Sequence, residues 1–428
     1  MKKFTILFIA LVTTIFLFAG TNNSVQYREY HNKAINAYYN KNYKDWLKYN
    51  QKAFEIMPNN ARTIYYLAIA HALIDNQEKA LKFLSRAVEF GMGWSAAQDD
   101  DFKSLKGHPE FKKIINRIKE LNQPVNNSTI AYQLKERDLI PEGLAYDPVE
   151  KCFYLSSLHK CKIVKIDKDG NYSNFTSEKQ DGLRQVTGMK VDAGRRHLWV
   201  CSEVSNLNYI NPDSTEIGWS GVFQYDLRTG KLINKYTIFE EDIQHLFNDI
   251  VITKEGDVYL TDSRSQEIYK ISSKEKQLKV FFKNEGFSFL NGIALSNDEN
   301  SLYIADDGTG IFKLNLSNKN FEYLQTPDSI TTIGIDGLYL YENSLIAVQN
   351  GFSVARINRF FLDKSGEKIT RSKIIEMDNP HFIIPTTGAI ARDTFYYIAN
   401  SQLRSYGKDN NILPWKELKD IIILKAKL

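Results

Sequence analysis

The sequence predicts a mainly β protein: a six-bladed β-propeller preceded by a small all-α region of helical repeats. Residues 25–120 are rich in helix formers and lack strand alternation, whereas short runs of Val, Ile, Tyr and Phe, broken by Gly, Asn and Asp, follow from residue 128. The second pattern recurs six times. A chain of 428 residues is long for one domain. We expect a leader at 1–20, the helical repeats at 21–124 and the propeller at 125–428.

The first 20 residues have the pattern of a secretory signal. Lys2 and Lys3 precede Phe4–Phe18, which is apolar apart from three Thr. We therefore expect an exported protein, periplasmic or secreted, that meets the membrane only if the leader stays uncleaved as an anchor. The chain has three cysteines, too few for the disulfide framework of many exported proteins.

The helical region contains two units spaced 34 residues apart. Small residues recur at this spacing and let paired helices approach closely, and Pro58 ends the first unit; they are Ala34 with Ala68, and Ala53 with Ala87. The pattern resembles the tetratricopeptide repeat, closed by a helical stretch at 99–120. Two interpretations stand: a concave surface for a protein or peptide partner, or a packing module docked on the second domain.

The strand-rich region consists of six similar units. Their starts lie 43 to 61 residues apart, the length of a four-stranded propeller blade. The longest interval holds an insertion at 203–219, which we expect to form a loop over one face. Closing the ring requires strands from both ends of this region in one blade, and residues 130–134 and 421–428 are the candidates.

Each unit opens with a polar residue at the same place. The innermost strands of a propeller line its central channel, so these residues should form a ring at one mouth; they are Glu142, Thr187, Asn248, Asn291, Asp336 and Thr387. Carboxylate and amide oxygens suit hard divalent cations, and the two carboxylates balance the charge of one such ion. The ring has no Cys or His. We predict a metal site at Glu142, Asn248, Asn291 and Asp336, with Ca²⁺ favoured and Mg²⁺, Mn²⁺ or Zn²⁺ as alternatives. The competing interpretation is that the Asn-Gly and Asp-Gly pairs are ordinary turns.

Four segments of the strand region carry a family resemblance: PEGLAYD from Pro141, FNDIVITKEGDVYLTDS from Phe247, NGIALSNDENSLYIAD from Asn291 and IDGLYL from Ile335. They resemble the senescence marker protein, gluconolactonase and luciferin-regenerating enzyme family of calcium-dependent six-bladed propellers. The resemblance implies the same four metal ligands and hydrolysis of a lactone or ester. It also implies that Asp336 acts as general base.

The sequence departs from the family pattern next to the second ligand. Leu246 stands where a sugar-recognising Arg often lies, which puts a sugar lactone substrate in doubt. His245 lies close to Asn248 in the chain and is a second candidate catalytic residue.

Two functions follow from these features. The first is an exported metal-dependent hydrolase acting on a small lactone or ester. The second is a non-catalytic scaffold, in which the repeats and the propeller bind a protein or ligand in the cell envelope. The net charge of +4 gives no case for nucleic-acid binding.

Overall fold

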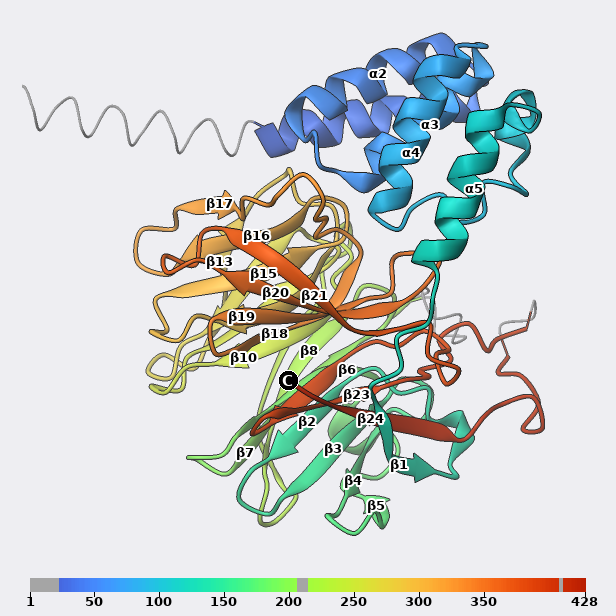
Figure 1. Ribbon diagram of the computed structural model, residues 1–428. Helices are drawn as coiled ribbons and strands as arrows, with labels where there is room; N and C mark the ends of the chain where they lie inside the picture. The colour runs from blue at the N-terminus through green and yellow to red at the C-terminus, as the bar shows by residue number, and fades with distance from the viewer. Residues whose placement is uncertain (1–22, 206–214, 408–410) are drawn as a thin grey trace, which may run out of the picture.

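The computed structural model describes residues 23–205, 215–407 and 411–428. A bundle of helices lies against one end of a propeller made of β-sheets, and α5 leads from the bundle into the propeller (Figure 1). The predicted leader, and most of the predicted insertion at 203–219, lie outside the described residues. No described helix is both long enough and apolar enough to cross a membrane.

The helical region consists of two helix pairs and a closing segment. A helix over residues 23–39 precedes α2 (Tyr43–Ile56), α3 (Ala61–Leu73), α4 (Gln77–Glu89), η1 (Asp100–Leu105) and α5 (Pro109–Leu121). Asparagine begins three of these helices: the side chains of Asn42, Asn60 and Asn76 accept hydrogen bonds from backbone N–H groups of the first turn.

The four alanines that repeat at 34-residue spacing are all completely buried. An alanine without exposed surface at each of these places allows the close helix approach that the sequence predicted. The paired helices fit the predicted tetratricopeptide-like region. The closing segment that was expected at 99–120 is formed by η1 and α5.

The propeller has six antiparallel four-stranded sheets, which confirms the predicted blade number. Blade one is β2 (Leu144–Asp147), β3 (Cys152–Ser157), β4 (Lys162–Ile166) and β5 (Tyr172–Asn174); blade two is β6 (Gln185–Asp192), β7 (His197–Glu203), β8 (Ser220–Asp226) and β9 (Leu232–Ile238). Blade three is β10 (Phe247–Ile252), β11 (Val258–Asp262), β12 (Glu267–Ile271) and β13 (Leu278–Lys283); blade four is β14 (Leu290–Leu295), β15 (Ser301–Asp306), β16 (Gly310–Asn315) and β17 (Phe321–Tyr323). Blade five is β18 (Ile335–Tyr341), β19 (Ser344–Gln349), β20 (Arg356–Leu362) and β21 (Ile369–Met377).

Blade six closes the ring with strands from both ends of the propeller. Its order is β22 (Gly388–Ala391), β23 (Thr394–Ile398), β24 (Ile421–Lys427) and β1 (Thr129–Leu134). β1 pairs antiparallel with β24, and Leu134 lies opposite Ile421. This confirms the pairing of 130–134 with 421–428. All three cysteines are buried and unpaired, consistent with apolar packing rather than cross-linking.

The helical region packs on the face of the propeller at which the inner strands begin. β14 and β18 start at this face, and the antiparallel strands β15 and β19 end there. Asn60 donates to the carbonyl of Gly308 at 2.7 Å, just beyond β15. An apolar cluster joins the two parts: Ala61, Ile64, Ala87 and Phe90 pack with Ile333 and Phe352. The helices therefore rest on the face where the predicted metal ring opens.

Candidate metal centre

The six polar residues predicted to form the ring all lie at the start of an inner strand and are 4–9% exposed. Hydrogen bonds connect neighbouring blades at this level. Thr187 Oγ1 donates to the carbonyl of Phe247 at 2.7 Å, and Thr387 Oγ1 donates to the carbonyl of Glu142. The ring joins the last blade to the first, as closure requires.

Close approach between inner strands explains the glycines that follow the ring residues. A Cβ at Gly143 would collide with the carbonyl of Thr187, and one at Gly188 with the carbonyl of Asn248. Neither glycine has a positive φ. The same holds for the glycines of the Asn-Gly and Asp-Gly pairs: Gly292 lies within β14 and Gly337 within β18, neither with a positive φ, and a Cβ on Gly292 would collide with the backbone of Asp336 and Leu338. The interpretation of these pairs as ordinary turns is therefore wrong.

Two predicted ligands carry buried oxygens that have no hydrogen-bond partner within the described residues: Glu142 Oε2 and Asn291 Oδ1. An unsatisfied buried oxygen is costly, about 1–3 kcal/mol, and more for a charged group. A cation in the ring would satisfy both oxygens. The residues present therefore fit a divalent metal ion.

The other two predicted ligands are held from behind and keep an oxygen free. The Ser263 hydroxyl donates to the carbonyl of Leu290 and accepts from Asn248 Nδ2 at 3.0 Å, which turns the amide oxygen of Asn248 the other way. Asp336 Oδ2 accepts from Asn350 Nδ2 at 2.6 Å, and this bond leaves Oδ1 available. Groups that orient metal ligands in this way are typical of metal sites.

The charges of the two ring carboxylates, Glu142 and Asp336, act on each other. Burial raises the pKa of Glu142 well above its usual range, and the charge of Asp336 raises it further. Burial raises the pKa of Asp336 to about 7, although the hydrogen bond from Asn350 opposes this. Blades one and five thus bring together two carboxyls that resist ionisation without a nearby positive charge.

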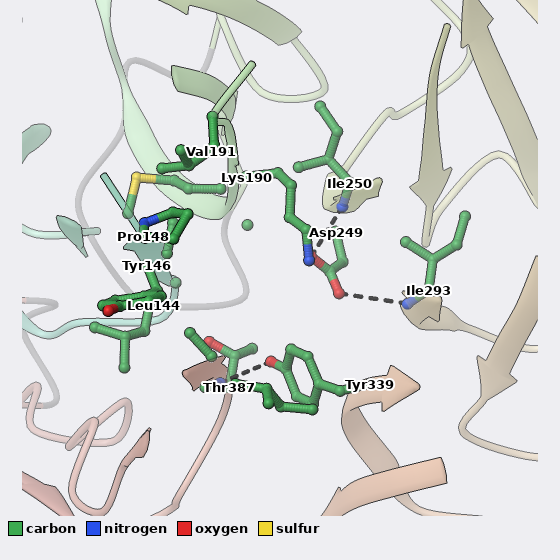
Figure 2. Close-up of a pocket in the computed structure, with 18 of the residues that line it drawn as sticks. Leu144, Tyr146, Pro148, Lys190, Val191, Asp249, Ile250, Ile293, Tyr339 and Thr387 are labelled. Carbon is green, nitrogen blue, oxygen red and sulfur yellow. Dashed lines mark hydrogen bonds between the residues drawn. The ribbon is translucent and has the colours of Figure 1, made fainter. Parts of the chain in front are cut away.

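A third carboxylate lies directly below the ring. Asp249 occupies the place where the other five units have glycine, and it accepts from the backbone N–H of Ile250 at 2.8 Å and of Ile293 at 3.3 Å. Burial raises the pKa of Asp249 to about 6. The side chain of Lys190 extends toward it across the channel (Figure 2), and its charge favours the ionised carboxylate.

The channel below the ring is a cavity of about 340 Å³. Inner-strand residues form most of its wall, including Leu144, Val191, Ile250 and Ile293, together with Tyr146 and Tyr339 (Figure 2). The protein packed around Lys190 lowers the pKa of its amine. Asp249 and Lys190 line this channel, whereas Glu142 and Asp336 belong to the ring above it. A single divalent cation would bring the formal charges of these three carboxylates and one lysine into balance.

Sequence analysis missed a further buried carboxyl near the ring. Glu203, the last residue of β7, is completely buried, and among the described residues only Ser205 Oγ donates to it, at 3.2 Å. Its Oε2 has no hydrogen-bond partner. Burial raises the pKa of Glu203 to about 8, and its charge contributes to the raised pKa of Glu142. The only signal in the sequence is an acidic residue at the end of an apolar run, at the border of the insertion.

The structure does not bring His245 to the four predicted ligands. Its Nδ1 lies 2.7 Å from Asp262 Oδ2, and its ring packs against Phe247 and Tyr269 with centroids 6.4 and 6.2 Å away. These contacts direct the imidazole into blade three. Within the described residues, nothing joins His245 to the ring, and its predicted catalytic role gains no support.

An acidic cluster elsewhere is occupied by an arginine. Asp147, Glu150 and Cys152 lie close enough to hold a metal ion. The guanidinium of Arg196 donates to both oxygens of Asp147, at 2.6 and 2.7 Å, and to Glu150 at 2.8 Å. This bidentate pair lowers the pKa of Asp147, although burial opposes it. The cluster is an ion pair that ties blade one to blade two.

No protein-family model matches the sequence, and no curated protein matches it. A gluconolactonase from Xanthomonas campestris is a similar solved structure, with 12% identity, 72% of this chain and 92% of that chain covered, and a TM-score of 0.48. A luciferin-regenerating enzyme has 15% identity, with 72% and 96% covered and a TM-score of 0.48. The calcium-binding protein regucalcin from Agrobacterium tumefaciens has 16% identity, with 69% and 93% covered and a TM-score of 0.47.

These are proteins of the kind that the sequence resemblance named, and the fold which that resemblance implied is the one in Figure 1. At identities of 12–16% and TM-scores of 0.47–0.48, these likenesses carry no argument about what this chain does. Any activity of this chain has to be argued from its own ring and channel.

Proposed function

We propose that this protein binds one divalent cation, preferably Ca²⁺, in the ring at the channel mouth and hydrolyses a small lactone or related ester there. The observation that carries the proposal is the pair of buried, unpartnered oxygens on Glu142 and Asn291. Asn248 and Asp336 complete the ligand set, with their free oxygens oriented by Ser263 and Asn350. Oxygen ligands of this composition suit calcium.

A bound ion would polarise the substrate carbonyl and stabilise the oxyanion that develops on it. The protein supplies the fixed geometry: the ring residues begin six inner strands that are packed around one axis. Asp336 keeps its proposed role as general base only through Oδ1, because Oδ2 accepts from Asn350. A carboxylate that also holds a cation is a weak base.

Calcium titration by calorimetry on the protein without residues 1–20 tests the metal site. We expect one ion per chain for the wild type and at least a tenfold weaker affinity for Asn291→Ala and Asp336→Ala. Asn318→Ala, an exposed asparagine in the same blade as Asn291, is the matched control and should bind normally. Equal binding by all four proteins, or none by the wild type, contradicts the metal site.

Hydrolysis is tested separately with a panel of aliphatic lactones, sugar lactones and aryl esters. We expect turnover that a chelator abolishes and that added Ca²⁺ restores. Leu246 offers no charged group for sugar hydroxyls, so aliphatic lactones or aryl esters should be better substrates than sugar lactones.

A non-catalytic scaffold remains the second candidate, because the described contacts of His245 leave the ring without an imidazole base. Calcium binding without turnover on the whole panel, together with a partner retained from cell-envelope extract by the intact protein, would favour the scaffold. Both functions include export, and sequencing the N-terminus of the secreted or periplasmic protein would show cleavage near residue 20.

A further inference from the structure

One segment of the propeller touches both the helical region and a predicted metal ligand. This segment, residues 350–355, connects β19 to β20 and is called the β19–β20 connection below. Phe352 lies at its centre and is 8% exposed. Its ring packs in the apolar cluster with Ile64 of α3 and with Phe90, the residue that ends α4. The helical region therefore covers the middle of the connection.

The C-terminal end of the connection is bound to the helical region by Arg356. Its guanidinium lies 4.7 Å from the centre of the Phe352 ring and donates through Nη2 to the carbonyl of Phe90 at 3.1 Å. Arg356 Nε donates to Gln349 Oε1 at 3.0 Å. Gln349 Nε2 in turn donates to the carbonyl of Ile333 at 2.9 Å, so both ends of the connection are tied to the same face.

Asn350, at the N-terminal end, contacts the candidate metal ligand. Its Nδ2 donates to Asp336 Oδ2 at 2.6 Å and to the carbonyl of Pro385 at 2.8 Å. Asn350 thus links blade five to the start of blade six and sets the direction of the Asp336 carboxylate. Only one residue separates it from Phe352, on which the helices rest.

A second set of contacts leads from the helices to the same place. Arg62 of α3 pairs with Asp307 at 3.1 Å, and the carbonyl of Asp307 accepts from the N–H of Gly334 at 3.0 Å. The carbonyl of Gly334 accepts from the N–H of Gly351 at 3.0 Å. Gly334 has φ +67°, and a Cβ on Gly351 would collide with the Cα of Gly334, so the two backbones fit together only as glycines.

We infer that the helical region is a positioning element for the candidate metal centre: it holds the β19–β20 connection, so that Asn350 fixes the orientation of Asp336. The part of this inference that concerns metal affinity rests on the proposed function, whereas the part that concerns the connection does not. Residues that orient metal ligands typically change metal affinity by about 10–100-fold when they are replaced. The docked helices therefore act on the metal site without contacting the ion.

Hydrogen exchange and calcium titration on the full chain without residues 1–20 test the inference. The variant Phe90→Ala removes an aromatic ring of the helical region from the apolar cluster that contains Phe352. Phe111→Ala is the matched control, because Phe111 is equally buried in the helical region but packs only among helices. We expect faster amide exchange at 349–356 and about tenfold weaker Ca²⁺ binding for Phe90→Ala, and neither change for Phe111→Ala.

A double-mutant cycle distinguishes positioning from general loosening. Asn350→Ala should weaken Ca²⁺ binding about tenfold without changing exchange in the helices. Adding Phe90→Ala to Asn350→Ala should cost almost nothing further, because the helices act through Asn350. Independent, additive losses would overturn the inference, as would an unchanged Ca²⁺ affinity in Phe90→Ala or an equal loss in Phe111→Ala.

The two proposals fail in different ways. If the wild type binds no divalent ion, the proposed function is wrong. Exchange in the metal-free protein then decides the present inference: unchanged exchange at 349–356 in Phe90→Ala would refute it, and faster exchange confined to that segment would support it.

Discussion

At the scale of residues, the candidate site is defined by buried carboxyls that form no ion pair within the described part of the chain. Asp336 has a pKa of about 7 in the folded protein against an ordinary value of 3.8, and Glu203 has one of about 8 against 4.5. A carboxyl with a raised pKa binds protons more tightly when folded than when unfolded. Unfolding then releases protons, and stability falls as the pH rises from the unfolded to the folded pKa.

This gives a prediction for the metal-free protein. Its Tm should decrease between about pH 4.5 and pH 8, and saturating Ca²⁺ should raise the Tm most at the upper end of this range. Asp336→Asn removes one of these carboxyls, so its Tm in chelator should fall less steeply over the same range. Differential scanning calorimetry with chelator and with Ca²⁺ measures both. A Ca²⁺ effect of the same size at pH 5 and pH 8 would contradict the prediction.

The residue scale also shows what the sequence could and could not predict about the site. The common position of the four candidate ligands was predictable because the blade repeat puts equivalent residues at equivalent places around one axis. Asn350 and Glu203 were not, because polar residues recur at the ends of the second strands and no pattern in the sequence shows which of them reach the ring. The prediction that His245 lies near the ring rested on its short distance from Asn248 along the chain. Residues three apart in extended backbone point to opposite sides, and the imidazole accordingly enters blade three.

At the scale of elements, the inner strands are packed so closely that positions such as Gly143 have no room for a side chain. Gly143→Ala would place a methyl group against the carbonyl of Thr187 on the neighbouring inner strand. We expect it to lower the free energy of unfolding by about 1–3 kcal/mol, because the two strands must move apart. Gly107→Ala is the control, since a Cβ there would meet no atom within 4 Å. Urea unfolding of both variants measures the difference, and equal stabilities would show that the inner strands can separate at little cost.

The elements themselves were predictable because strand and helix periodicities differ and each recurs. The placement of the helical region on the propeller was not predictable, because it depends on single contacts such as Arg62 with Asp307 and Asn60 with Gly308. Asn60 caps a helix and Arg62 lies on a helix surface. A polar residue at such a position is compatible with exposure to solvent as well as with contact to another domain.

At the scale of the whole molecule, closure makes the two ends of the propeller depend on each other. β24 lies between β23 and β1, and the side chains of Ile421 and Ile423 are completely buried in the cluster that joins blades six and one. A blade built from both ends can form only when the intervening five are in place. The candidate metal ring has the same requirement, because Glu142 and Thr387 meet across this junction.

Ile423→Ala should therefore affect the whole propeller. We expect the cavity left by the missing side-chain atoms to lower the free energy of unfolding by about 2–4 kcal/mol. We also expect a single unfolding transition at a lower urea concentration, because the blades of an open ring are not stable on their own. Ile130→Ala, in the neighbouring strand of the same blade, replaces a side chain that is 45% exposed and should cost far less. Urea unfolding followed by tryptophan fluorescence and by circular dichroism measures both. If Ile423→Ala instead produced two transitions, with part of the propeller retained, the blades would be independent units, and closure could not be what holds the ring residues together.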